Sequence, residues 1–81
     1  MNTVKYVLTR GLFGELKIIV FPNLFPHKDF ESFKPISAGF ITFGVRDGKP
    51  VCYCHGESIG LGLKSNPDYD TEIAMEQLGL I

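Results

Sequence analysis

Hydrophobic and polar residues alternate along the first part of the chain. In "TVKYVLT" (3–9), Val4, Tyr6 and Leu8 fall on one face, as in a half-buried β-strand. "ELKIIVF" (15–21) repeats the alternation after a short connection that contains two glycines. Two such segments joined by a short glycine-containing turn predict a β-hairpin.

The next segment, "PNLFPHKDFESFKP" (22–35), interrupts this alternation. Phe30 and Phe33 are three positions apart, as on one face of a helical turn. Proline is favoured at the first position of a helix and disfavoured inside it, so Pro26 and Pro35 mark a start and a stop. The segment therefore predicts a short helix from Pro26 to Phe33.

Period-two segments return in the second half of the chain. "ISAGFITFGV" (36–45) is rich in β-branched and aromatic residues, and "PVCYCH" (50–55) follows it. Between them, "RDGK" (46–49) contains an Asp-Gly pair, which is typical of tight hairpin turns. "SIGLGLKS" (58–65) also alternates, and it predicts a fifth, short strand.

The last segment, "NPDYDTEIAMEQLGLI" (66–81), has the features of a helix. Asn66 or Asp70 is a suitable N-cap, and the acidic residues of the first turn suit the positive end of the helix dipole. Gly79 is expected to end the helix. Residues with helical spacing are expected to face the sheet: Ile73, Ala74, Gln77, Leu78 and Ile81.

These elements predict an α+β fold in the order ββαβββα. The expected architecture is a small antiparallel sheet of four to five strands, with a short central helix and a C-terminal helix packed on one face. The length of 81 residues and the 44% hydrophobic content fit a single small domain spanning residues 1–81.

Charge and cysteine content exclude some classes of protein. The net charge is −1 with no run of like charge, which argues against a polybasic surface for nucleic acid or membrane. The longest aliphatic and aromatic run, 18–21, is far short of the roughly 20 residues of a membrane span. The two cysteines are expected to be free thiols, which predicts a cytoplasmic location.

The segment "CYCHGESIG" (52–60) contains the residue types most often used in chemistry. Gly56 to Gly60 formally match the G-x-S-x-G nucleophile elbow, but that motif needs a helix after its serine and a later histidine. No histidine follows His55, and the residues after Ser58 alternate as extended chain. We therefore expect a glycine-bounded turn in which Glu57 and Ser58 are exposed.

The cysteines of this segment also invite a metal interpretation. Cys52 and Cys54 project from one face of a strand, so both thiols could reach one ion. Structural zinc sites, however, prefer pairs with two to four residues between the ligands, and adjacent His55 with distant His27 does not supply that spacing. The favoured interpretation is two small core hydrophobes, with no metal and no other cofactor.

"GFITF" (39–43) resembles the end of the longer signature segment of RNA-recognition modules, and "VFPNL" (20–24) resembles the shorter one. The leading basic residue, glycine and first aromatic of that signature are replaced by Ile36, Ser37 and Ala38. Only about fifteen residues separate the two segments, too few for the helix and strand expected between them. These departures from the signature argue against nucleic-acid binding.

"ISAGFITF" (36–43) and "SIGLGLKSNPDYD" (58–70) together resemble small uncharacterised proteins of bacteria and their phages. This resemblance implies a bacterial or phage origin and a small binding or regulatory role. It implies no activity and no site residue.

The connection between residues 24 and 33 holds more apolar side chains than a short loop usually hides. It could be a lid over the core or a patch exposed for another protein. We expect a non-enzymatic interaction or regulatory module that binds a protein partner or associates with itself. The candidate interaction surface comprises Phe13, Leu24, Phe25, His27, Phe30 and Phe33.

Two alternatives remain open. The first is a small-ligand binder or a minor enzyme that uses segment 52–58, with His27, His55, Glu57 and Ser58 as its polar groups. The second is a nucleic-acid-binding module, whose affinity would fall steeply with salt.

Overall fold

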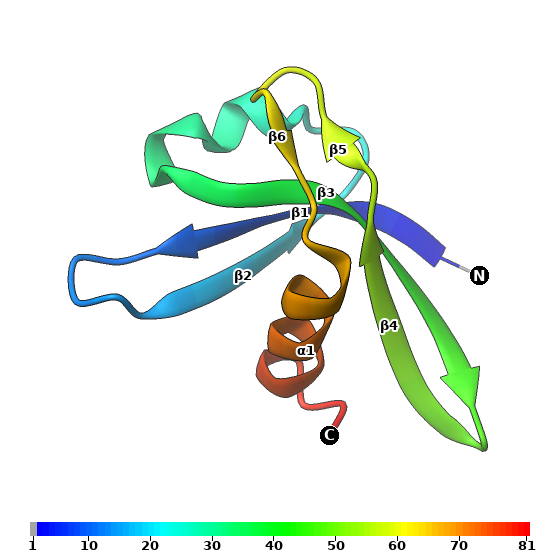
Figure 1. Ribbon diagram of the computed structural model, residues 1–81. Helices are drawn as coiled ribbons and strands as arrows, with labels where there is room; N and C mark the ends of the chain where they lie inside the picture. The colour runs from blue at the N-terminus through cyan, green and yellow to red at the C-terminus, as the bar shows by residue number, and fades with distance from the viewer. Residues whose placement is uncertain (1) are drawn as a thin grey trace.

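The computed structural model describes residues 2–81, in which four strands form an antiparallel sheet with the order β2-β1-β3-β4 (Figure 1). A short 3-10 helix follows the first hairpin, and an α-helix ends the chain. The α+β fold predicted from the sequence is confirmed. The elements are β1 (Asn2–Arg10), β2 (Leu16–Phe21), η1 (His27–Phe33), β3 (Pro35–Arg46), β4 (Lys49–His55), β5 (Glu57–Ser58), β6 (Leu63–Lys64) and α1 (Pro67–Gln77).

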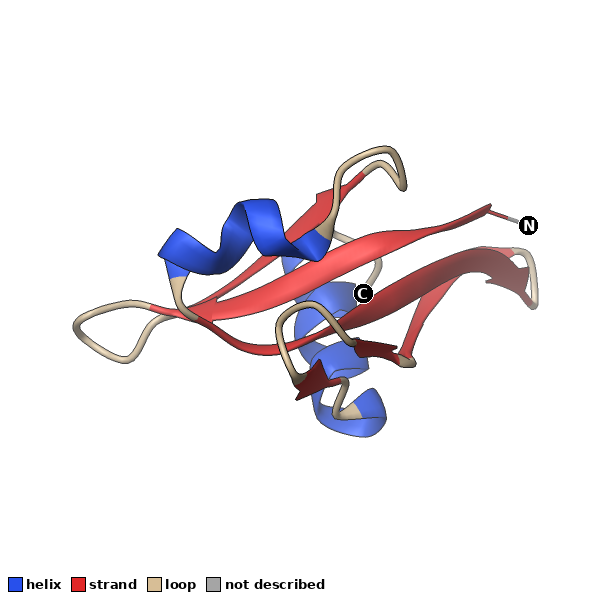
Figure 2. Cartoon of the chain, turned by 90° about the horizontal axis from the view of Figure 1, so that it is seen from above, coloured by secondary structure: helices blue, strands red, loops and turns tan. Residues whose placement is uncertain are grey.

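The two faces of the sheet are covered by different elements, and Figure 2 shows η1 and α1 on opposite sides. The side chains that alternate along the strands therefore enter two cores. The α1 side holds the larger buried cluster: Tyr6, Leu8, Ile18, Ile41, Cys52, Cys54 and Ala74. On the η1 side, Val7, Phe21 and Ala38 form a smaller buried cluster. Each large apolar side chain buried in this way stabilises the fold by roughly 1.5–3 kcal/mol.

The sheet curls around α1, so that this one helix reaches both outer strands. Thr71 Oγ1 accepts the amide N–H of Cys54 on β4 at 2.8 Å. At the other edge, Gln77 Oε1 accepts the amide N–H of Ile18 at 2.8 Å, and Gln77 Nε2 donates to the carbonyl of Leu16 at 2.6 Å. These side chains occupy backbone groups that an open sheet would leave free for another strand.

The turn between β3 and β4 has the conformation expected from its sequence. Asp47 and Gly48 both have positive φ, at 52° and 77°. Positive φ at both central residues is the requirement of a type I′ turn, which Asp-Gly fulfils with little strain. The predicted hairpin is confirmed, and its register aligns Phe40 with His55 and Arg46 with Lys49.

The predicted fifth strand over 58–65 is wrong. The chain instead makes a separate two-stranded ribbon, in which Glu57 pairs with Lys64 and Ser58 with Leu63. The turn between them closes with a hydrogen bond from the amide of Gly62 to the carbonyl of Ile59 at 3.1 Å. The edge of β4 is already bonded to α1, and Gly62 has the φ of +67° that a tight turn accepts, so the chain folds back on itself.

The start of α1 also differs from the expectation. Asn66 is the N-cap, but its side chain makes no capping hydrogen bond. Instead, the carboxylate of Asp70 reaches back from inside the helix, and its Oδ2 accepts the amide N–H of Asn66 at 3.0 Å. Asp70 is fully buried, so its side chain does not lie in the solvent near the end of the helix dipole.

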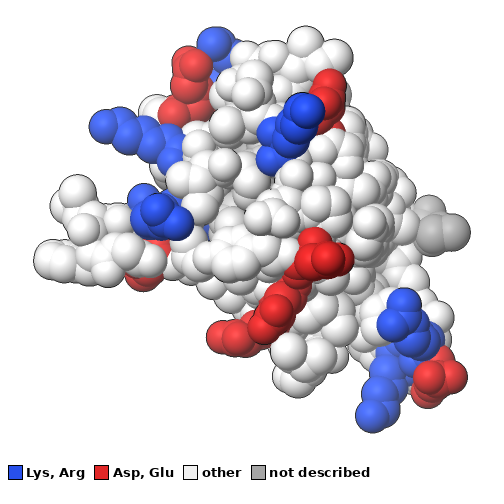
Figure 3. All heavy atoms as spheres, viewed as in Figure 1, with Lys and Arg blue, Asp and Glu red and all other residues white. Residues whose placement is uncertain are grey.

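Charges of both signs are distributed over the surface. In Figure 3, acidic side chains gather over α1, whose residues 67–77 include no Lys or Arg, and basic side chains are spread over the rest of this face. No helix within residues 2–81 is both long and apolar enough to cross a membrane.

Candidate functional site

A continuous row of aromatic rings crosses the face of the sheet opposite α1. Its members come from β2, η1, β3 and β4, and neighbouring ring centroids are 4.0 to 6.3 Å apart. The aromatic row consists of Phe33, Phe30, Phe21, His27, Phe40, His55 and Tyr53, in that order. Aromatic pairs at these distances add to the stability that burial provides.

One half of the row is closed by η1, except at its end, where Phe33 is exposed. Phe30 stacks on buried Phe21 with a centroid distance of 4.0 Å. His27 is buried between Phe21 and Phe40, and its Nε2 lies 2.8 Å from the carbonyl oxygen of Gly39. Because a carbonyl oxygen only accepts, Nε2 of His27 carries the proton. His27 therefore fastens η1 to β3, and it is not part of an exposed surface.

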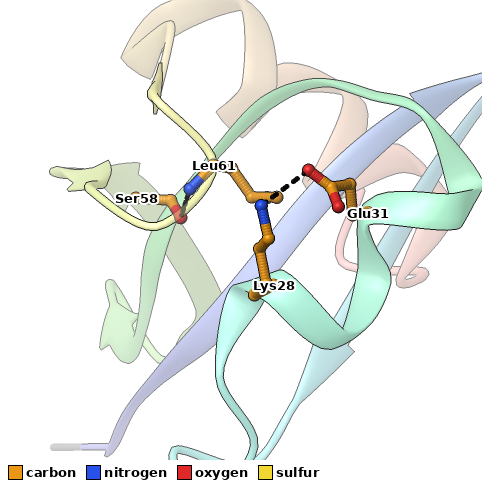
Figure 4. A network of polar contacts seen from close by, with 4 residues as sticks. All are labelled: Lys28, Glu31, Ser58 and Leu61. Carbon is orange, nitrogen blue, oxygen red and sulfur yellow. Dashed lines mark hydrogen bonds and ion pairs between the residues drawn. The ribbon is translucent and has the colours of Figure 1, made fainter.

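The ribbon of β5 and β6 supports this closed half. Leu61 and Leu63 pack against the cluster around Phe21. Figure 4 shows Leu61 extending toward η1, where Lys28 and Glu31 form an ion pair at 2.9 Å. The turn of the ribbon is held by Ser58, whose Oγ accepts the amide N–H of Leu61 at 3.3 Å.

The other half of the row is open to solvent. Phe40 and His55 are half-buried, and Tyr53 retains 52% of its accessible surface. Tyr53 and His55 lie with nearly parallel rings, 11° apart. The orientation of His55 is fixed by a 2.8 Å hydrogen bond between its Nε2 and Thr42 Oγ1, which in turn is 2.8 Å from Thr3 Oγ1.

A groove of about 330 Å³ lies beside this open half, between the start of η1 and the β5–β6 turn. Phe40 and Lys5 line it from the sheet, and Pro26 and Ile59 line it from the two sides. Ile59 is 87% exposed, so its side chain is accessible to a ligand at the edge of this concavity. We call this groove, together with the adjoining rings of Phe40, His55 and Tyr53, the aromatic groove.

The residues of the candidate interaction surface predicted from the sequence do not lie together in the structure. Phe13 lies before β2, and Leu24 and Phe25 lie after it, so they are at opposite ends of this strand. Phe13 and Leu24 are 94% and 85% exposed. Phe33 is exposed at the far end of η1. Of the predicted surface residues, His27 lines the aromatic groove, and Phe25 is connected to it through its carbonyl oxygen, which accepts a hydrogen bond from Lys5 Nζ at 3.0 Å.

The residues of segment 52–58 do not form one chemical site. Cys52 and Cys54 enter the core below α1, whereas Tyr53 and His55 lie on the opposite face. Burial raises the pKa of Cys54 to about 12, helped by neighbouring Cys52 and Asp70, and burial also raises the pKa of Cys52. Both thiols are therefore neutral at physiological pH, and neutral thiols are poor nucleophiles and poor metal ligands.

Ser58 also departs from the sequence-based expectation. It was expected to be exposed, but it is buried and bonded within the β5–β6 turn, while Glu57 is exposed. A nucleophile elbow requires a helix directly after its serine, but here the chain turns at 59–62 and enters β6. Within residues 2–81, no group of three or more His, Cys, Asp or Glu side chains could hold a metal ion.

Sequence reasoning missed a buried polar pair. The hydroxyl of Tyr6 donates to Asp70 Oδ2, and both residues are fully buried. A signal was present in the sequence, because Asp70 precedes Ala74 by four positions and Gln77 by seven. Such spacing places all three on one helix face.

No family model matches the chain, and the comparisons with curated proteins and solved structures find no match either. The resemblance of 36–43 and 58–70 to bacterial and phage proteins stays a prediction.

Proposed function

We propose that this protein is a non-enzymatic interaction module whose aromatic groove binds an extended, proline-containing segment of another protein. The observation that carries the proposal is the open half of the aromatic row, where Tyr53, His55 and Phe40 continue into a groove flanked by exposed Ile59. Rows of partly exposed rings are the surfaces on which polyproline-type segments dock.

The two outer strands of the sheet have few free backbone groups, which favours a partner that binds to side chains over one that adds a strand. On β4, Pro50 has no amide N–H, and the amides of Cys52 and Cys54 donate to Met75 Sδ and Thr71 Oγ1. On β2, Gln77 occupies groups of Leu16 and Ile18. A partner that adds a strand would have to displace these contacts. An extended segment lying across the rings would displace none of them.

The charges near the groove favour a protein segment over nucleic acid. Lys5 is engaged with the carbonyl of Phe25, and Lys28 is paired with Glu31. Glu57 contributes a negative charge to the same concavity. Nucleic-acid binding draws most of its affinity from uncompensated basic groups, which are scarce here.

The free, buried cysteines are consistent with a reducing compartment, and we infer that the protein works in the cytoplasm. The high pKa of the Cys54 thiol and the bonding of Ser58 within its turn support a binding role rather than an enzymatic one. These groups lack the activated state that nucleophilic catalysis requires.

An array of short peptides, with and without proline, provides the first test. Peptides that bind are then measured by fluorescence anisotropy against the wild type, Ile59→Asp and Phe13→Ser. Ile59 and Phe13 are both exposed, so neither change should unfold the protein, but only Ile59 borders the groove. We expect proline-containing binders whose affinity falls about tenfold or more with Ile59→Asp and stays within about twofold with Phe13→Ser.

Three outcomes would contradict the proposal. The first is that no peptide binds more tightly than about 1 mM. The second is an equal loss in both variants, which would show that the groove is not the contact. The third is binding of single-stranded oligonucleotides with a steep dependence on salt, which would assign the rings to base stacking. Analytical ultracentrifugation of the same variants tests for self-association. Phe13→Ser should abolish self-association if the turn between β1 and β2, where Phe13 lies, mediates it.

A further inference from the structure

A second cavity lies on the α1 side of the sheet, away from the aromatic groove. It has a volume of about 240 Å³ and is bounded by the end of β1, the start of β3 and the first turn of α1. Leu8, Ile36 and Tyr69 give it apolar walls, and Asp70 and Ser37 also line it. Pockets that take drug-sized molecules measure about 300–1,000 Å³, so this cavity suits a smaller ligand.

Two buried polar atoms at this cavity have no partner. Asp70 Oδ2 accepts from the hydroxyl of Tyr6 and from the amide of Asn66, but Oδ1 of the same carboxylate accepts no hydrogen bond within residues 2–81. Ser37 Oγ is likewise buried and unbonded in that part of the chain. Buried acceptors in native proteins nearly always have partners, so an unsatisfied pair beside a cavity indicates a missing donor.

The rim of the cavity has the opposite charge. Arg10 is exposed and lines the opening, and in residues 2–81 its guanidinium forms no ion pair. A ligand that matches both parts of the cavity needs an N–H donor at its inner end, toward Asp70 and Ser37. It also needs an acid group at the opening of the cavity, toward Arg10. Its remaining part must be small and apolar to lie against Ile36 and Tyr69.

We propose that this cavity binds a free α-amino acid with an apolar side chain. Its ammonium group would donate to Asp70 Oδ1 and Ser37 Oγ, and its carboxylate would face Arg10. A simple anion would be repelled by Asp70 inside the cavity. A metal ion would find one carboxylate oxygen and one hydroxyl, fewer ligands than metal sites use. This site is independent of the aromatic groove, because it opens on the other side of the sheet.

The test is an NMR titration of the ¹⁵N-labelled full chain with the standard L-amino acids, each to about 10 mM. Two analogues of leucine separate the charges: N-acetyl-leucine lacks the ammonium group, and 3-methylbutylamine lacks the carboxylate. Ser37→Ala removes only a hydroxyl that has no partner, so it should fold normally. Arg10→Gln removes the charge at the rim, and Arg46→Gln, at the β3–β4 turn, is its matched control.

We expect at least one apolar amino acid to shift the amide signals of Ser37 and of residues 66–70. Ser37→Ala and Arg10→Gln should each weaken binding about fivefold or more, whereas Arg46→Gln should change it less than twofold. The amine should bind more weakly than its parent amino acid and be insensitive to Arg10→Gln. The proposal is overturned if no amino acid shifts these signals, or if N-acetyl-leucine binds as well as leucine. In the first case an ordered water would be the partner of Asp70.

Discussion

The hydrogen bond between Tyr6 and Asp70 joins the middle of β1 to the first turn of α1. Both side chains are fully buried, and the two residues are 64 positions apart in the sequence. Replacing Tyr6 with Phe removes the hydroxyl and leaves the ring in place. Asp70 Oδ2 then keeps only the amide of Asn66 as a donor. The substitution therefore isolates one buried polar contact between the sheet and the helix.

The size of the effect follows from burial. A hydrogen bond to a charged group contributes roughly 1.5–3 kcal/mol, and the carboxylate that loses it stays out of water. We expect Tyr6→Phe to lower the free energy of unfolding by about 2 kcal/mol. A domain of this size is stabilised by only about 3–5 kcal/mol, so the loss is about half of the total. The melting temperature should fall by about 8–16 °C.

Urea unfolding at neutral pH, followed by circular dichroism, measures this change. Tyr53→Phe is the matched control, because it removes the same hydroxyl from a ring that is half exposed. We expect the control to stay within about 0.5 kcal/mol of the wild type. A Tyr6→Phe variant as stable as the control would refute the reasoning, since it would mean that the buried carboxylate does not need its donor.

Three further predictions test other contacts. Because the pKa of Cys54 rises from 9.0 to about 12 on folding, the folded chain holds more protons between these pH values. Between about pH 9 and 12 this thiol therefore lowers the free energy of unfolding by up to about 1.4 kcal/mol per pH unit. In urea titrations Cys54→Ala should remove that share of the slope and leave the share of Cys52 and Tyr6, whose pKa values burial also raises. Gly39→Ala would place a Cβ atom 2.4 Å from the carbonyl oxygen of His55, so we expect a loss of about 1–3 kcal/mol in thermal unfolding and no loss for Gly44→Ala, where space is open. Gln77→Ala frees the edge of β2 and should produce concentration-dependent light scattering; clear solutions at high concentration would show that the edge is protected by other means.

The strands were predictable because their physical signal is local. Period-two alternation located β1 and β2, and the Asp47-Gly48 pair fixed the β3–β4 turn through its positive φ angles. The ribbon of β5 and β6 was missed because the alternation in 58–65 is also that of a strand. Its true conformation depends on the edge of β4, which a helix later in the sequence occupies.

The candidate site was harder to predict, because alternation does not say which face of a strand is covered. Phe30 and His27 resemble Phe25 in sequence, yet His27 is buried and Phe30 half-buried in η1, whereas Phe25 stays exposed. The contribution of β4 to the aromatic row was missed for a related reason. His55 is close in sequence to Glu57 and Ser58, yet in β4 it stacks on Tyr53, on the face opposite the two cysteines.

The same alternation separates the two proposed sites. In β1, Lys5 faces the aromatic groove, and Leu8 lines the cavity on the α1 side. In β3, Phe40 lines the aromatic groove and Ser37 lines the cavity on the α1 side. A ligand in either site therefore contacts strands that also line the other site, but it contacts none of the same side chains. A peptide in the groove should leave amino-acid affinity unchanged, unless binding alters the curl of the sheet that α1 maintains. If the peptide does change the affinity for the amino acid, the size of that change measures how strongly the curvature of the sheet links the two sites. The link would run through β1 and β3, because both sites are lined by these strands.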